Sequence, residues 1–196
     1  MNDIDYRGLE NNEIESWETN PISKIYPLLK GGIFHRTSIS GYKGIKERGK
    51  IIPNQGEFLY TYPQSKTYFA SSKGYVCLFD FTTASDYQCI SICDTWSGFF
   101  FDQEPFTIVL RLSKTYLVDK LIPNTSAPKL GDPEYKGYIP YIESWYPEPI
   151  PYEAIEGLII SKWLGFDESP IFKEFSTSEI DEAELIINAI QEENRQ

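Results

Sequence analysis

Hydrophobic residues along this chain gather in short runs that match the length of β-strands and are separated by polar and turn-forming residues. The runs are rich in β-branched and aromatic side chains, a composition typical of strands. None approaches the roughly 20 consecutive apolar residues that a membrane-spanning helix needs. The runs that predict strands are Ile33–Thr37, Tyr68–Ala70, Tyr75–Phe81, Thr107–Leu112 and Leu158–Trp163.

One helix is predicted directly after the first of these strands. Residues 41–48 carry Tyr42 and Ile45 at helical spacing. Ser40 stands in the position of an N-cap and Gly49 in that of a left-handed C-cap.

A second helix is predicted over the C-terminal residues 176–196, where Ser178 and Asp181 take capping-box positions. Short strands, few long helices and a Pro- and Gly-broken loop between residues 123 and 151 favour an α+β fold, with one split sheet or two packed sheets. The helix would pack on this core through one hydrophobic stripe, formed by Ile180, Ala183, Ile187 and Ile190.

Length and composition predict a single domain over residues 1–196. The chain is 41% hydrophobic and can bury a core. Residues 1–23 read as an acidic N-terminal extension and lack the pattern of a signal peptide. Because three cysteines are too few for a disulfide framework, we expect a reducing cytoplasm as the setting.

Charge is unevenly distributed along the chain. The formal net charge is −11, which argues against a general nucleic-acid binder. Residues 30–50, here called the basic segment, hold six bases against Glu47, whereas residues 1–20 hold six acids against Arg7. An anion site would need such a basic segment, although a solvated helix face would also explain it. One prediction is that residues 1–20 fold over this segment as an autoinhibitory lid.

Metal and hydrolase chemistry find little support in the residue spacing. A zinc site could be drawn from His35, Cys77, Cys89 and Cys93, but no CxxC or paired-histidine spacing is present, so we expect no metal. With one histidine and no marked nucleophile, a Ser-His-Asp triad is not indicated.

Three segments carry the candidate chemistry. The first is Phe34-His35-Arg36-Thr37-Ser38, followed by the predicted helix and by Gly49-Lys50-Ile51-Ile52-Pro53. The second runs from Thr67 to Tyr75 and contains Tyr68, Phe69, Ala70, Ser72 and Lys73. The third runs from Tyr141 through Glu143 to Ile150-Pro151 and on to a strand.

In this order the three segments resemble the ADP-ribosyltransferase superfamily, in the His-Tyr-Glu branch that includes diphtheria toxin and the poly(ADP-ribose) polymerases. The resemblance covers roughly residues 33–163. It implies a split β-sheet core with short helices, and NAD as the substrate.

The resemblance also implies a role for each matching residue. His35 would bind the adenosine ribose of NAD, and the backbone at Arg36 would hold the nicotinamide carboxamide. Tyr68 and Tyr75 would sandwich the nicotinamide ring. Glu143 would bind the nicotinamide-ribose hydroxyl and stabilise the cation that forms as the glycosidic bond breaks. Thr37 and Ser72 complete the predicted NAD-binding set.

The sequence departs from the family pattern at two positions. Arg36 replaces the usual glycine, and could crowd the nicotinamide or bind a phosphate. Tyr141 stands two residues before Glu143, where arginine-modifying toxins carry Gln or Glu, so an arginine acceptor is disfavoured. Packing is the alternative role for each site residue, and Glu148 and Glu153 compete with Glu143 as the catalytic acid.

The resemblance implies an NAD-dependent ADP-ribosyltransferase that modifies a macromolecule, and the net charge favours protein over nucleic acid as the acceptor. By analogy, the domain would suit a bacterial toxin with an antitoxin partner, a phage-defence effector or a phage-encoded modifier. Alternatives are an NAD glycohydrolase, an RNA 2′-phosphotransferase, for which basic residues are lacking, and a non-catalytic acidic binding or immunity protein. No membrane partner is expected.

Overall fold

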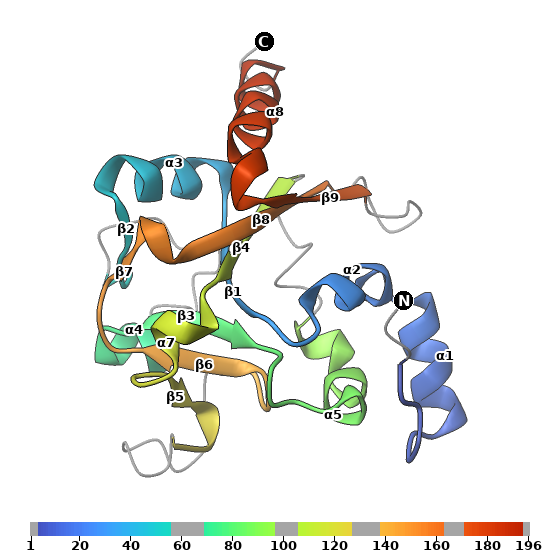
Figure 1. Cartoon of the computed structure of the whole chain (residues 1–196). Coiled ribbons are helices and arrows are strands. Elements are labelled where there is room, and N and C mark those ends of the chain that lie inside the picture. Colours follow the sequence, from blue (N-terminus) through green and yellow to red (C-terminus); the bar gives the residue numbers. More distant parts are fainter. Residues whose placement is uncertain (1–3, 56–68, 97–105, 127–137, 163–170, 194–196) are drawn as a thin grey trace.

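The computed structural model describes residues 4–55, 69–96, 106–126, 138–162 and 171–193 (Figure 1). Its centre is an antiparallel sheet with the strand order β5-β6-β3-β1-β4-β8-β9, beside a small sheet of β2 and β7. The predicted α+β class is therefore confirmed. The strands are β1 (Ile33–Thr37), β2 (Lys50–Ile51), β3 (Val76–Asp80), β4 (Phe106–Leu112), β5 (Ile122–Pro123), β6 (Glu143–Tyr146), β7 (Ile150–Pro151), β8 (Ile155–Lys162) and β9 (Ile171–Ser176).

Short helices cover both faces of the sheet. Side chains alternate between the faces along each strand. One face packs against α3, α8 and the β2–β7 pair, and the other against α1, α2 and α5. The helices are α1 (Asn11–Thr19), α2 (Ile22–Leu29), α3 (Ile39–Arg48), α4 (Phe69–Lys73), α5 (Asp86–Ser91), α7 (Lys114–Leu117) and α8 (Ile180–Glu193).

The strand between Tyr68 and Ala70 was wrongly predicted. Phe69 and Ala70 begin helix α4, and Tyr68 lies outside the described residues. Both side chains are buried against Trp145, so tertiary packing overrides a local aromatic composition typical of strands. The helix ends at Gly74, whose φ of 69° favours glycine.

Helix α3 and its N-cap both begin two residues earlier than predicted. The hydroxyl of Ser38, and not that of Ser40, accepts a hydrogen bond from the Gly41 amide, and Ile39 is the first helical residue. Gly49 ends the helix with φ 68°, as predicted. The C-terminal stripe is confirmed at Ala183, Ile187 and Ile190, which are buried, while Ile180 is half-buried. The predicted capping box is wrong, because Ser176 and Glu179 form it in place of Ser178 and Asp181.

Residues 4–20, the described part of the predicted lid, do not fold over the basic segment. Helix α1 packs against α2 and α5, far from α3 (Figure 1). Trp17 is buried and contacts Tyr26 and Trp96. The acidic charges of α1 therefore lie on the outside of a hydrophobic cluster that belongs to the core.

Candidate functional site

The main sheet divides between β1 and β3. Strand β1 pairs with β4 along its whole length, from Ile33 to Thr37, but with β3 only at Ile33 and Phe34. Beyond these positions β3 pairs with β6 alone. Pairing between β1 and β3 therefore stops before residues 35–37 of β1, and this break in pairing is here called the β1–β3 gap.

Backbone groups of Arg36 point into this gap. The Phe81 amide donates to the carbonyl of Gly32, whereas the Asp80 amide donates to Ile142 on the opposite side. Because backbone groups alternate in direction along an antiparallel strand, those of Phe34 and then Arg36 face β3. The predicted nicotinamide-holding backbone therefore lies at the edge of the gap.

His35 spans the gap with its side chain. If pairing had continued, Arg36 would oppose Cys77; instead the Cys77 carbonyl lies 3.0 Å from Nδ1 of His35. A carbonyl only accepts, so Nδ1 carries the proton and Nε2 is left as an acceptor. Burial lowers the pKa of His35 against a smaller opposing effect of the Cys77 hydrogen bond, and the nearby Arg36 charge lowers it further. The ring is thus neutral at pH 7.

Glu143 is a buried acid on the second strand away from His35. Its side chain is 5% exposed. The Ile139 amide donates to Oε2 at 2.8 Å and the Trp145 indole donates to Oε1 at 2.8 Å. Burial raises its pKa to about 7, although these two hydrogen bonds and one from the Cys77 thiol oppose the rise. Glu143 is therefore an acid that titrates near neutral pH.

The strand register separates the predicted site residues between two faces of the sheet. Phe79 opposes Phe34 on β1 and Glu143 on β6, so these side chains share one face. Arg36 follows Phe34 on that same face, while His35 and Thr37 alternate to the other. Glu143 and Arg36 thus share a face, and His35 reaches the β1–β3 gap from the opposite one.

Aromatic side chains form a wall beside Glu143. Trp145 is fully buried, and its ring centroid lies 4.3 Å from that of Phe69. The ring centroids of Phe69 and Tyr75 are 6.4 Å apart. Tyr75 is half-buried against this cluster. Ser72 is exposed on α4 and donates to the Phe69 carbonyl. The predicted ring partner Tyr68 lies outside the described residues.

The two competing acids occupy exposed positions. Glu148 follows β6 and pairs with Lys120 at 2.7 Å, with about half of each side chain exposed. Glu153 is exposed in the 3₁₀ turn Tyr152–Ala154. Neither shares the burial of Glu143.

A turn with unusual backbone geometry leads into β6. Tyr141 has a φ of 65°, uncommon for a residue other than glycine, and the Ile142 amide donates across it to Pro140. Its side chain is 47% exposed. The position two residues before Glu143 therefore faces outward while Glu143 faces inward.

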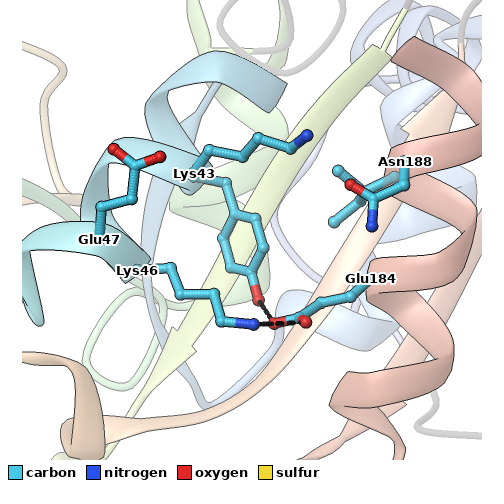
Figure 2. A pocket seen from close by; sticks show the side chains of 7 residues that line it. Lys43, Lys46, Glu47, Glu184 and Asn188 are labelled. Carbon is cyan, nitrogen blue, oxygen red and sulfur yellow. Dashed lines mark hydrogen bonds and ion pairs between the residues drawn. The ribbon is translucent and has the colours of Figure 1, made fainter. Parts of the chain in front are cut away.

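The basic segment is partly neutralised by acids. Lys30 pairs with Asp86 at 2.8 Å, and Lys46 pairs with Glu184. Glu184 also accepts from Tyr42, across a cavity of about 200 Å³ between α3 and α8 (Figure 2). This volume is too small for a dinucleotide. The cavity is lined by Tyr42, Lys43, Lys46, Glu47, Glu184, Ile187 and Asn188.

Two contacts of Glu143 were not anticipated from the sequence. The Cys77 thiol and the Trp145 indole both donate to its carboxylate. Cys77 and Trp145 are cross-strand partners, a relation that follows from the pairing of β3 with β6. No local signal in the sequence reports that register.

Neither metal nor membrane features appear in the part of the chain that the structure describes. There, no group of three or more His, Cys, Asp or Glu side chains is arranged to hold a metal ion. Over the same ranges, no helix combines the length and hydropathy needed to cross a membrane.

Comparisons with known proteins found no relative. No protein-family model matches the chain, and neither a curated protein nor a solved structure matches it significantly.

Proposed function

We propose that the chain is an NAD-dependent ADP-ribosyltransferase. The observation that carries the proposal is the β1–β3 gap, with His35 and the Arg36 backbone on one edge and a buried acid two strands away. Strands β6, β3 and β1 are neighbours in the sheet, which supports the expectation that the three segments converge on one place. Split pairing between β1 and β3 agrees with the split sheet that the resemblance implies, while the family's specific fold remains part of the proposal.

The residues suit cleavage of the bond between nicotinamide and ribose. Nε2 of His35 can accept from a ribose hydroxyl, and the amide and carbonyl of Arg36 can bond a carboxamide in the manner of a strand partner. As the C–N bond breaks, its electron pair leaves with nicotinamide and a ribosyl cation develops. A fixed carboxylate at Glu143 would stabilise that cation. An acceptor nucleophile then bonds to the ribosyl carbon and gives up its proton.

The acceptor that we favour is a macromolecule, and protein over nucleic acid because the net charge is −11. Water as acceptor would make the protein an NAD glycohydrolase with the same site. Three free cysteines support action in a reducing compartment such as the cytoplasm. A toxin, phage-defence or phage-encoded role, with an antitoxin or immunity partner, belongs to the same proposal by analogy.

The test is nicotinamide release from NAD by the purified chain, with and without cell lysate as a source of acceptor. We expect Glu143→Gln to lower release by about 100-fold or more, the range for loss of one preorganised electrostatic group. Because the carboxylate must be ionised, the rate should rise with pH through about 7.

The matched control is Glu153→Gln, which makes the same change at an exposed acid ten residues downstream. It should leave release unchanged. Wild-type protein that releases no nicotinamide under any of these conditions would refute the proposal, and so would equal release by wild type and Glu143→Gln.

One observation favours a non-catalytic binding or immunity protein as the second candidate. Both carboxylate oxygens of Glu143 already accept hydrogen bonds from the protein, and the side chain is almost fully buried. A purely structural acid would look the same. Absent nicotinamide release together with recovery of a stoichiometric protein partner would support this candidate.

A further inference from the structure

Trp145 connects the carboxylate of Glu143 with the aromatic wall formed by α4. Its indole Nε1 donates to Oε1 of Glu143 at 2.8 Å, and its ring lies 4.3 Å from that of Phe69. The ring of Tyr138 meets it edge-on at 5.4 Å. With two rings packed against it and no exposed surface, the indole is held in a close-packed site that restricts its orientation.

A second buried tryptophan shows what a purely structural indole does. Trp96 is also fully buried, and its Nε1 donates at 2.8 Å to a backbone carbonyl, that of Cys89. A buried indole N–H needs an acceptor, and a carbonyl satisfies it without charge. Trp145 differs because its acceptor is an ionisable carboxylate.

We infer that Trp145 is a positioning residue that holds the carboxylate of Glu143 in one orientation on β6, the strand next to β3 on the side away from the β1–β3 gap. The inference rests on the proposed function for its catalytic consequence. The indole fixes Oε1, the Ile139 amide fixes Oε2, and the Cys77 thiol of the adjacent strand contacts the same group. Three donors from two strands and a loop leave the side chain little rotational freedom.

Replacing Trp145 by phenylalanine removes the N–H but keeps an aromatic ring in the wall. A hydrogen bond to a charged group contributes more than one between neutral groups, so its loss should lower kcat by about 10- to 100-fold. KM for NAD should change little, because the Trp145 side chain is fully buried and has no surface to offer a substrate. This hydrogen bond lowers the pKa of Glu143. Its removal should therefore move the rise in rate that accompanies ionisation of Glu143 to higher pH.

The experiment follows the titration of Glu143 by NMR with ¹³C-labelled glutamate carboxyl groups, assigned by the loss of one signal in Glu143→Gln. In Trp145→Phe we expect this titration to move to higher pH than in wild type. Trp96→Phe is the matched control, because it removes an equally buried indole whose hydrogen bond has the same length. It should leave the titration of Glu143 unchanged. Equal titration of Glu143 in wild type and Trp145→Phe would overturn the inference.

A measurement on the wild-type chain covers the case in which Trp145→Phe fails to fold. The indole ¹H–¹⁵N signal of Trp145 should shift as Glu143 titrates, and the shift should vanish in Glu143→Gln. The Trp96 signal should stay constant. If no indole signal follows the carboxyl titration, Trp145 does not hold Glu143.

These readouts separate the inference from the proposed function. The titrations need no enzymatic activity, so a moved titration in a chain that releases no nicotinamide would refute the transferase proposal and leave the positioning role supported. If nicotinamide release depended on Glu143 but Trp145→Phe left the titration of Glu143 unchanged, the transferase proposal would be supported and the positioning role refuted.

Discussion

Two buried acids of this chain have similar exposed fractions and opposite shifts in pKa. Asp86, in the first turn of α5, is 7% exposed and Glu143, at the start of β6, is 5% exposed. Asp86 accepts from the Asp5 amide, the Tyr26 hydroxyl and the Lys30 ammonium, each at 2.8 Å. Glu143 accepts from an amide, an indole and a thiol, none of which is charged.

One cause of the difference is the Lys30 cation, and Asp86 also lies in a less enclosed environment than Glu143. Burial alone would raise the pKa of Asp86, but the hydrogen bonds from Lys30, the Asp5 amide and Tyr26 outweigh it and leave that pKa below its ordinary value. At Glu143 neutral donors do not outweigh burial, and its pKa rises to about 7. Asp86 is thus an ionised structural acid that ties residues 5, 26 and 30 to α5. Glu143 gains and loses its proton near neutral pH, which is typical of reactive acids.

The largest expected effect is an opposite dependence of stability on pH. The raised pKa of Glu143 contributes stability that is fully present below its ordinary value of 4.5 and is lost as pH rises through about 7. At 1.36 kcal/mol per pKa unit, the free energy of unfolding of wild type should fall by about 3 kcal/mol relative to Glu143→Gln between pH 4.5 and 8. Urea unfolding at a series of pH values measures this difference.

Asp86 provides the internal contrast for that experiment. Its lowered pKa contributes stability that is present above the ordinary value of 3.8 and is lost as pH falls through the folded value. The difference between wild type and Asp86→Asn should therefore shrink on acidification. If the stability difference from wild type changed in the same direction with pH for both variants, the contrast between the two acids would be wrong.

Removing the charge of Asp86 at constant pH should have the next largest effect. Asp86→Asn leaves the Lys30 ammonium facing an uncharged amide, and we expect the free energy of unfolding to fall by about 2 kcal/mol at pH 7. This is somewhat less than the cost of breaking a fully buried pair, because Lys30 is 31% exposed and can reach water. Urea unfolding measures it, with Asp119→Asn as the control at an exposed aspartate. Nicotinamide release per folded molecule should be unchanged. Equal stability of the two variants would show that Asp86 contributes nothing to anchoring the N-terminal residues.

Much of the sheet could be predicted from the sequence because its central strands are local runs of β-branched and aromatic residues. The bounds of β1 match the prediction from Ile33 to Thr37, and those of β4 differ by one residue. Gly49 marked the end of α3 for a local reason, since it adopts the left-handed conformation there. Each of these features depends on a few neighbouring residues.

Long-range pairing explains what the sequence could not show. The β1–β3 gap depends on where two strands more than 40 residues apart stop pairing, and the contact of Trp145 with Phe69 depends on how α4 lies across β6. The same packing accounts for the helical conformation of Phe69 and Ala70, where the local sequence predicted a strand. Glu143 could be identified as a candidate acid, but its burial and its neutral donors follow from the register of β3 and β6.

The smallest expected effect belongs to a third acid, Glu148, which has the cation that Glu143 lacks but not its burial. Its carboxylate pairs with Lys120 at 2.7 Å on the surface, where water screens both charges and the long side chains must be ordered. Glu148→Gln should therefore leave the urea midpoint and nicotinamide release within experimental error of wild type, and Lys120→Met should behave the same way. A clear loss of release in Glu148→Gln alone would move the proposed catalytic role from Glu143 to Glu148. A loss of stability in both variants would instead show that an exposed cation orders this acid as effectively as Lys30 orders Asp86, and that burial is not what separates the acids of this chain.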